Sequence, residues 1–150
     1  MNGLKIRSIG KEDTPKMVNL MYQYIVDFYR QPSPCRDDLT NLVHHLIDNP
    51  GSGLQFAAEK DDNLIGFATL YFTFSTLKVK KQAILNDLFV ITEMRGQHIG
   101  EKLFNTCLSH IRDNDFSSME WETAKDNYTA QALYDKMGGK LTDWIHYEMK

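Results

Sequence analysis

The sequence has few of the features that mark a metal site, a disulfide framework or a membrane span. It contains only two cysteines, Cys35 and Cys107, which lie far apart and lack the close spacing of zinc ligands. We therefore expect free thiols and no bound metal. The N-terminal region has no apolar run as long as a signal peptide or a membrane-spanning helix, which favours a cytoplasmic protein that does not associate with membranes.

An excess of positive charge is also absent. The chain has 17 Lys and Arg against 20 Asp and Glu, a formal net charge of -3, whereas nucleic-acid binding depends on neutralising phosphates. We expect no nucleic-acid partner. A length of 150 residues with 42% hydrophobic residues suffices for one core but not for two, so the sequence predicts a single domain over residues 1–150.

Hydrophobic periodicity predicts an alternation of strands and helices. Strands are expected where apolar residues alternate or run continuously, at residues 4–9, 54–60, 64–75, 82–91, 117–123 and 144–149. Helices are expected where such residues recur at helical spacing. The first runs from a cap at Asp13 or Thr14 to about residue 28, and two more are expected at 37–48 and 99–112. The last runs from a cap at Asp126 or Asn127 to the stop at Gly138 and Gly139. This order predicts an α+β or α/β fold, with a mixed central β-sheet flanked by helices on both faces.

The stretch RGQHIGEKL, residues 95–103, places two glycines and an arginine just before an amphipathic helix. A Walker loop would have Lys and then Ser or Thr after its second glycine, but Glu101 and Lys102 follow Gly100. A dinucleotide loop would need a third glycine and a place after the first strand of the fold. The remaining interpretation is a helix N-terminus with free N–H groups and Arg95 beside it, which suits a pyrophosphate.

Two stretches resemble motifs of one enzyme family. LFVITEMRGQHIG resembles motif A of the GCN5-related N-acetyltransferases (GNAT), and AKDNYTAQALYDKMGGK resembles their motif B. The similarity covers roughly residues 54–140, and GFATLYFTFS and LNDLFV are most similar to the branch that acetylates polyamines and other small amines. The resemblance implies the GNAT-like acyl-CoA N-acyltransferase fold and acetyl-CoA as the cofactor.

The resemblance also implies where acetyl-CoA binds. Backbone groups of the strand ending at residues 88–90 would pair with the pantetheine arm, and the N–H groups of residues 96–101 would hold the pyrophosphate. The implied cofactor-binding residues are Leu88, Phe89, Val90, Arg95, Gly96, Gln97, His98, Ile99, Gly100, Glu101, Asn127 and Tyr134. For the side chains of residues 88–90, a core position is an equally good interpretation.

Acetyl transfer to an amine needs one group that accepts a proton and one that donates a proton. An alkylamine with a pKa of ~10.4 arrives protonated, and Asp87 is the best candidate to remove its proton, unless it only caps or forms a salt bridge. Tyr134 lies at the family's position for the acid that protonates the leaving thiolate, although a tyrosine on an amphipathic helix can also be core. Asn86 departs from the polyamine branch, which has an acid there, and this leaves the identity of the base open.

Aromatic residues of the first predicted helix suggest how the amine is held. Tyr22, Tyr24, Phe28 and Tyr29 can line an amine pocket, because aromatic faces attract ammonium groups, or can form core. The preferred function is transfer of an acetyl group to the primary amine of a small molecule, such as a diamine, polyamine or amino-acid-like compound, by direct attack in a ternary complex. A protein or peptide N-acetyltransferase and a non-catalytic acyl-CoA-binding regulatory domain are the alternatives. The resemblance also implies a homodimer.

His98 departs from motif A, which has glycine at this place because the backbone runs close to the pyrophosphate. A left-handed conformation costs a residue other than glycine ~1–2 kcal/mol. Histidine must therefore adopt an ordinary φ, accept strain, or offset it by donating a hydrogen bond to a phosphate. We expect the first or the last of these.

Overall fold

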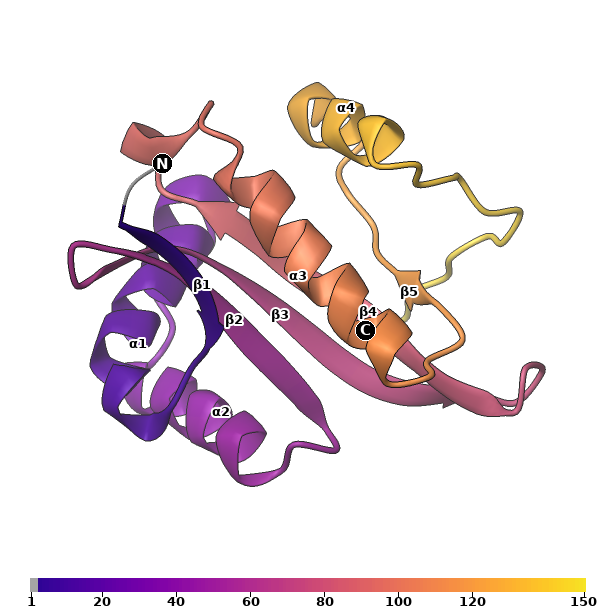
Figure 1. Ribbon diagram of the computed structural model, residues 1–150, viewed down its shortest axis with the longest axis horizontal. Helices are drawn as coiled ribbons and strands as arrows, with labels where there is room; N and C mark the ends of the chain where they lie inside the picture. Colours follow the sequence, from indigo (N-terminus) through magenta and orange to yellow (C-terminus); the bar gives the residue numbers. More distant parts are fainter. Residues whose placement is uncertain (1–2) are drawn as a thin grey trace.

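The computed structural model describes residues 3–150 and has a mixed sheet of five strands in the order β1-β2-β3-β4-β5 (Figure 1). β1 (Leu4–Ser8), β2 (Gly53–Lys60), β3 (Asn63–Ser75) and β4 (Lys80–Val90) are antiparallel neighbours. The short β5 (Met119–Glu120) pairs with β4 in the parallel sense. The predicted mixed sheet is confirmed.

Helices cover both faces of this sheet, as the sequence predicted. The chain forms the 3₁₀ turn η1 (Lys11–Asp13), α1 (Thr14–Tyr22), the π-helical segment η2 (Gln23–Phe28) and α2 (Arg36–Asp48) before β2. The 3₁₀ turn η3 (Thr92–Met94) and α3 (Ile99–Asp113) follow β4, and α4 (Tyr128–Lys136) follows β5. α1 and α2 lie on one face of the sheet and α3 on the other, whereas α4 lies away from the sheet (Figure 1). None of these helices in residues 3–150 is long and apolar enough to cross a membrane.

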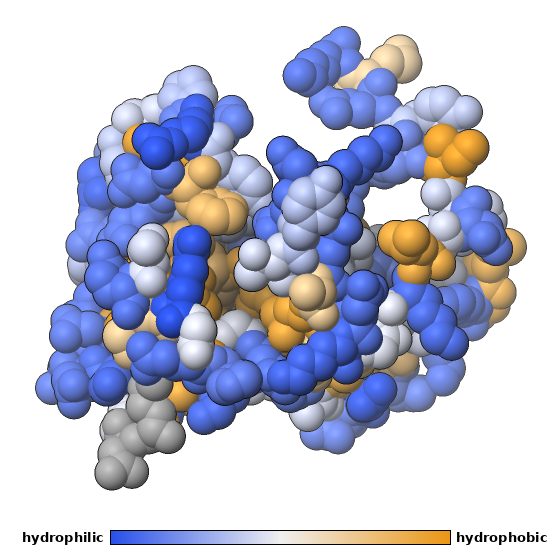
Figure 2. Space-filling model, turned by 90° about the horizontal axis from the view of Figure 1, so that it is seen from above, coloured by the Kyte–Doolittle hydropathy of each residue, from blue (hydrophilic) through white to orange (hydrophobic). Residues whose placement is uncertain are grey.

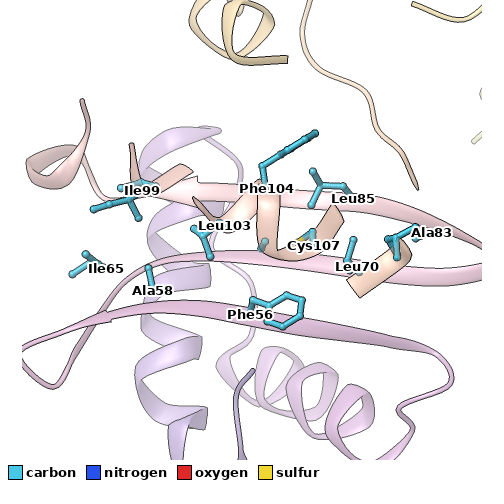
Figure 3. Close-up of a cluster of buried hydrophobic side chains, with 13 residues drawn as sticks. Phe56, Ala58, Ile65, Leu70, Ala83, Leu85, Ile99, Leu103, Phe104 and Cys107 are labelled. Atoms are coloured by element: carbon cyan, nitrogen blue, oxygen red, sulfur yellow. The ribbon is translucent and has the colours of Figure 1, made fainter. Parts of the chain in front are cut away.

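Two buried clusters hold these layers together. On the α3 side, Leu103, Phe104 and Cys107 pack against Phe56 and Leu70 of the sheet (Figure 3). On the other side, α1 and α2 pack against Phe67 and Phe89. Each fully buried large side chain contributes about 1.5–3 kcal/mol, so both helical layers are fixed by the sheet between them.

Local signals set the ends of several elements. Asp61 and Asp62 both have positive φ, 52° and 63°, which gives the tight turn between β2 and β3 the two left-handed residues of a type I′ hairpin. Asn127 caps α4 by accepting a hydrogen bond from the Ala130 N–H at 3.2 Å. Gly138, with φ 88°, ends α4. The predicted hairpin, the Asn127 cap and the glycine stop are confirmed.

The predicted last strand is wrong. Residues 144–149 pair with no strand in the part of the chain that the structure describes, and Trp144, Ile145, Tyr147 and Met149 are 76–95% exposed. The predicted strand at residues 117–123 is likewise reduced to Met119–Glu120. Alternation along a segment shows that it suits a sheet face, but a strand also needs a neighbouring edge for its N–H and C=O groups, and the sequence does not reveal that edge.

The first helix also differs from the prediction. The α-helical hydrogen-bond pattern ends at Tyr22, and the chain continues through the wider turn of η2, in which the Tyr29 N–H donates to the Tyr24 carbonyl at 3.1 Å. Single π-helical turns often occur at functional sites. Here the turn brings the rings of Tyr24 and Tyr29 within 5.0 Å of each other, at the end of the sheet where β4 finishes.

Candidate active site

A bulge interrupts β4 where the site is formed. Thr69 of β3 pairs with Asp87 and Leu70 pairs with Leu85, so Asn86 is the extra residue of β4. The side chain of Asp87 lies on the α1 side of the sheet, and that of Asn86 reaches a chamber beside β4. The distortion of β4 is therefore at Asn86, next to Asp87.

Beyond this bulge the outer edge of β4 is open. β4 and β5 pair only at Ala83 with Met119 and Ile84 with Glu120, so no strand within residues 3–150 covers residues 86–90 on that side. Backbone N–H and C=O groups on such an edge can hydrogen-bond an extended ligand as an added strand would. This is the edge that the sequence assigned to the pantetheine arm, at Leu88, Phe89 and Val90.

The side chains of these three residues are divided between the two cores. Leu88 and Val90 belong to the cluster under α3, and Phe89 to the cluster under α1. The core interpretation is thus correct for the side chains, while the backbone edge is available to a ligand.

The loop before α3 turns sharply. Gly96 has φ 77° and His98 has φ 63° with ψ 19°, which places both residues in the left-handed region. The expectation of an ordinary φ for His98 is wrong, because the chain must reverse here to enter α3. The Lys102 N–H donates to the His98 carbonyl at 3.1 Å as the first turn of α3 forms. The N–H groups before it, at residues 99–101, are the ones that a helix N-terminus offers to an anion.

The side chain of His98 contacts Glu101 rather than projecting alone. Its Nδ1 lies 3.2 Å from Glu101 Oε2, and Lys136 Nζ of α4 lies 2.9 Å from the same oxygen. The pKa of Glu101 is lowered, mainly by Lys136 and then by His98, both of which favour its charged form. Glu101 thereby links the loop, α3 and α4.

The side chain of Arg95 is held by groups of β4 and η2. Its Nε donates to the Val90 carbonyl at 3.0 Å, and its guanidinium lies over the rings of Phe28 (5.1 Å) and Phe89 (5.7 Å). Arg95 therefore fastens the loop to the end of β4 and to η2. Gln97 and Ile99 lie on either side of His98, with Gln97 exposed and Ile99, the first residue of α3, buried against the sheet.

A small chamber lies between η2, β4 and α4. It has a volume of about 60 Å³, and much of its wall is aromatic. Its lining residues are Tyr24, Phe28, Tyr29, Leu85, Asn86, Leu88, Trp121, Glu122, Thr123, Asn127, Ala130 and Tyr134. A view of the molecule from above shows hydrophobic side chains in the hollows between largely hydrophilic outer surfaces (Figure 2).

Tyr134 is brought to the chamber by α4. Its ring packs against Trp121 at 5.3 Å and Phe104 at 6.1 Å, which fixes the side chain between α4, the β5 region and α3. Burial, with a smaller contribution from Tyr29, raises its pKa. The phenol therefore keeps its proton at neutral pH, as a proton donor must.

Asp87 does not line the chamber, whereas Tyr24 and Asn86 do. Burial raises the pKa of Asp87, while Thr69, Tyr24 and Asn86 partly offset this by favouring the charged form. The Asn86 Nδ2 donates to Asp87 Oδ1 at 3.0 Å. A buried carboxylate with a raised pKa is a stronger base than an exposed one. The sequence identified the carboxylate but gave no signal for Tyr24 as the residue between it and the chamber.

Other residues of the chamber could not be identified from the sequence. Trp121, Glu122 and Thr123 reach it because the chain leaves the sheet after β5, which no local pattern indicates. Tyr22, grouped with the aromatic residues of the first helix, instead bonds Ser33 away from the chamber. No cluster of three or more His, Cys, Asp or Glu side chains in residues 3–150 is placed to hold a metal ion.

Comparison with known proteins identifies the family. The model of the Acetyltransferase (GNAT) family matches residues 18–139. YhfO, an uncharacterized N-acetyltransferase of Bacillus subtilis (strain 168), is 30% identical over 145 residues, 96% of this chain and 95% of that protein. The chain belongs to the GNAT acetyltransferase family.

Solved structures agree with this GNAT fold. A crystal structure of a probable acetyltransferase superposes with a TM-score of 0.87 at 24% identity, covering 97% of each chain. A predicted acetyltransferase from Clostridium acetobutylicum, solved with acetyl-CoA, has a TM-score of 0.81 at 16% identity, covering 97% of this chain and 96% of that one. The suspected GNAT membership is confirmed, and the chain is an acetyl-CoA-dependent N-acetyltransferase.

The GNAT residues present here fit acetyl-CoA. The open edge of β4 offers hydrogen-bonding groups to the amides of a pantetheine arm, and the N-terminus of α3 offers N–H groups to a pyrophosphate. A Cβ built at Gly100 would have its nearest neighbour at 3.9 Å, in Val90. No core side chain therefore crowds the loop backbone at this position.

Proposed function

We propose that this GNAT protein transfers the acetyl group of acetyl-CoA to the primary amine of a small molecule, by direct attack in a ternary complex. The observation that carries the proposal is the chamber between η2, β4 and α4. Its small volume, aromatic wall and single carboxylate, Glu122, suit the end of a compact cation rather than a folded protein segment. A protein or peptide acceptor would need an open groove in its place.

Residues in and beside the chamber would supply the proton transfers that this reaction needs. Tyr134 would donate a proton to the leaving thiolate, and Asp87, reached from the chamber through its neighbours, would accept one from the amine. Leu88, Phe89 and Val90 would hold the cofactor arm through their backbone, and residues 95–101 with Asn127 would complete the cofactor site. Acetyl-CoA, when bound, supplies the activated acetyl group.

The proposal is tested by following thiol release from acetyl-CoA with a panel of diamines, polyamines, amino acids, aminoglycosides and short peptides. Turnover of small amines in preference to peptides is expected. Turnover confined to peptides would contradict the small-molecule assignment. Thermal stabilisation by acetyl-CoA without turnover of any acceptor would instead support a non-catalytic binding domain.

We also propose that two copies associate. Support comes from exposed apolar side chains in two places, the β3–β4 hairpin, with Phe74, Leu77 and Val79 at 73–86% exposure, and residues 141–149. Exposed apolar surface of this extent often marks an association site. The single-domain organisation and the cytoplasmic location stay predictions.

A further inference from the structure

A row of buried polar side chains crosses the sheet toward the site. Gln55 of β2 pairs in register with Thr69 of β3, and Thr69 pairs with Asp87 of β4, so all three residues lie side by side on the α1 face. Gln55 is 2% exposed and Thr69 is fully buried. The Gln55 Nε2 donates to Thr69 Oγ1 at 3.0 Å.

Burying such a row is costly, and Gln55 Oε1 has no hydrogen-bond partner within residues 3–150. A polar group without a partner in the interior costs about 1–3 kcal/mol, and valine would fill the place of Thr69 without that cost. Since Thr69 Oγ1 accepts from Gln55, the one hydroxyl proton of Thr69 is free to face the neighbouring carboxylate of Asp87. The row therefore presents a donor to Asp87.

A second hydroxyl lies over the same part of the sheet. The ring of Tyr24 of η2 is fixed by edge contacts with Phe67 (5.3 Å) and Phe89 (5.5 Å), the strand pair next to Thr69 and Asp87 on this face, and its hydroxyl favours the charged form of Asp87, as a nearby donor does. Tyr24 lines the chamber and Asp87 does not. Asn86 also lines the chamber and bonds Asp87, but an amide does not exchange a proton as a phenol does. The phenol of Tyr24 is thus the ionisable group that connects the carboxylate with the chamber.

We propose that Tyr24 contacts the acceptor amine as a catalytic residue and relays its proton to Asp87, while Thr69 and Gln55 act as positioning residues for that carboxylate. This inference rests on the proposed acetyl transfer and adds the route by which the amine is deprotonated.

The proton balance of this route closes without any further reagent. An amine nitrogen of the ammonium acceptor gives one proton to the Tyr24 oxygen as the Tyr24 proton moves to Asp87. The neutral amine then forms the C–N bond while the thioester C–S bond breaks, and Tyr134 protonates the sulfur. The second nitrogen proton restores Tyr134, and Asp87 later releases its proton to solvent.

Asp87 is the titratable group that we expect to set the acid limb of the profile of kcat against pH. Tyr24 from η2 and Tyr71 from β3 face Asp87, and Tyr29 faces Tyr24. Burial raises the pKa of both Tyr24 and Tyr71, so they stay protonated while Asp87 titrates. Because Tyr24 and Thr69 favour the charged carboxylate, removing either hydroxyl should move the pKa of Asp87 upward.

The first test measures this coupling without any acceptor. The Asp87 carboxyl carbon is titrated by NMR in the wild type, Tyr24→Phe and Thr69→Val, with Tyr22→Phe as the matched control, since the Tyr22 hydroxyl bonds Ser33 at 2.7 Å instead. We expect a higher Asp87 pKa in Tyr24→Phe and Thr69→Val, and no change in Tyr22→Phe. An unchanged Asp87 pKa in Tyr24→Phe would overturn the relay.

The second test uses whichever acceptor the wild type acetylates best. Tyr24→Phe should lower kcat about 100-fold or more with the KM for acetyl-CoA unchanged, and Thr69→Val should lower kcat about tenfold with an acid limb at higher pH, restored in Thr69→Ser. Full kcat in Tyr24→Phe would overturn the relay alone. A wild type that acetylates only peptides would overturn the proposal of a small-amine substrate. The relay would then be tested by measuring kcat of the same variants with the peptide as acceptor.

Discussion

Lys136 of α4 and Glu101 of α3 form an ion pair, with 2.9 Å between Nζ and Oε2. This contact joins the helix that carries Tyr134 to the helix whose N-terminus we propose as the pyrophosphate site. Lys136→Met, which keeps most of the side-chain stem, should change the free energy of unfolding by less than about 1 kcal/mol, because the lysine is 57% exposed. We expect a higher KM for acetyl-CoA, since α4 loses a tether beside the loop. Steady-state kinetics check this, with the exposed Lys140→Met as control; an equal rise in KM in the control would contradict the tether.

Tyr134→Phe should separate proton donation from packing. The ring that contacts Phe104 and Trp121 is retained, so thermal unfolding should not change. Loss of the hydroxyl removes the proton for the leaving thiolate, and kcat should fall about 100-fold or more. Full acetyl transfer by Tyr134→Phe at saturating amine would exclude its role as the acid.

Asp13 should make the protein sensitive to acid. Its carboxylate accepts two hydrogen bonds from Arg7, at 2.7 and 2.8 Å, and one from the Gly10 N–H at 2.8 Å. The pKa of Asp13 is lowered, mainly by the Arg7 hydrogen bonds. A lowered folded-state pKa stabilises the protein above the ordinary pKa of aspartate, and this stability is lost as pH falls through the folded-state value.

Asp13→Asn should therefore lose about 2 kcal/mol of unfolding free energy at pH 7. The difference from the wild type should shrink on acidification below about pH 4. Urea unfolding at a series of pH values measures this. A difference that stays constant down to pH 2 would contradict the assignment.

His98→Gly tests how the loop accommodates a side chain at positive φ. Glycine adopts the φ of 63° without the Cβ penalty of ~1–2 kcal/mol, so the loop should keep its shape and the protein should unfold at a higher temperature. Because the His98 imidazole already contacts Glu101, we now expect strain rather than the phosphate hydrogen bond suggested by the sequence, and hence tighter acetyl-CoA binding in His98→Gly. Weaker binding with an unchanged loop would show that the imidazole contacts a phosphate, and His98→Ala, which retains the Cβ, is the matched control.

Much of this fold could be predicted because its signals are local. The turn at Asp61 and Asp62, the Asn127 cap, the glycine stop of α4 and the apolar stripe of α3 all depend on neighbours along the chain. The motif around Arg95 and Gly96 likewise predicted where α3 begins, and its binding of an anion stays a prediction.

The remaining features depend on contacts between distant segments. Residues 144–149 alternate as a strand does but lack a neighbouring edge in the described part of the chain. The placement of Tyr24 between Asp87 and the chamber results from the π-helical turn, and helical spacing alone did not reveal it. The positive φ of His98 follows from the reversal that the chain must make between β4 and α3.

The exposed C-terminal segment should mediate association of two copies. Trp144→Ser combined with Tyr147→Ser removes two side chains that are 76% and 86% exposed, so neither change should destabilise an isolated chain. Analytical ultracentrifugation should show a dimer for the wild type and a weaker one for the double variant. A monomeric wild type at high concentration would contradict the dimer.

The central claim is tested most directly by comparing kcat/KM for a small diamine and for a peptide that carries the same primary amine, with the acetylated product identified by mass spectrometry. The chamber predicts a larger kcat/KM for the diamine, with the acetyl group on its nitrogen. A larger kcat/KM for the peptide, or no acetylated amine of either kind, would contradict the account.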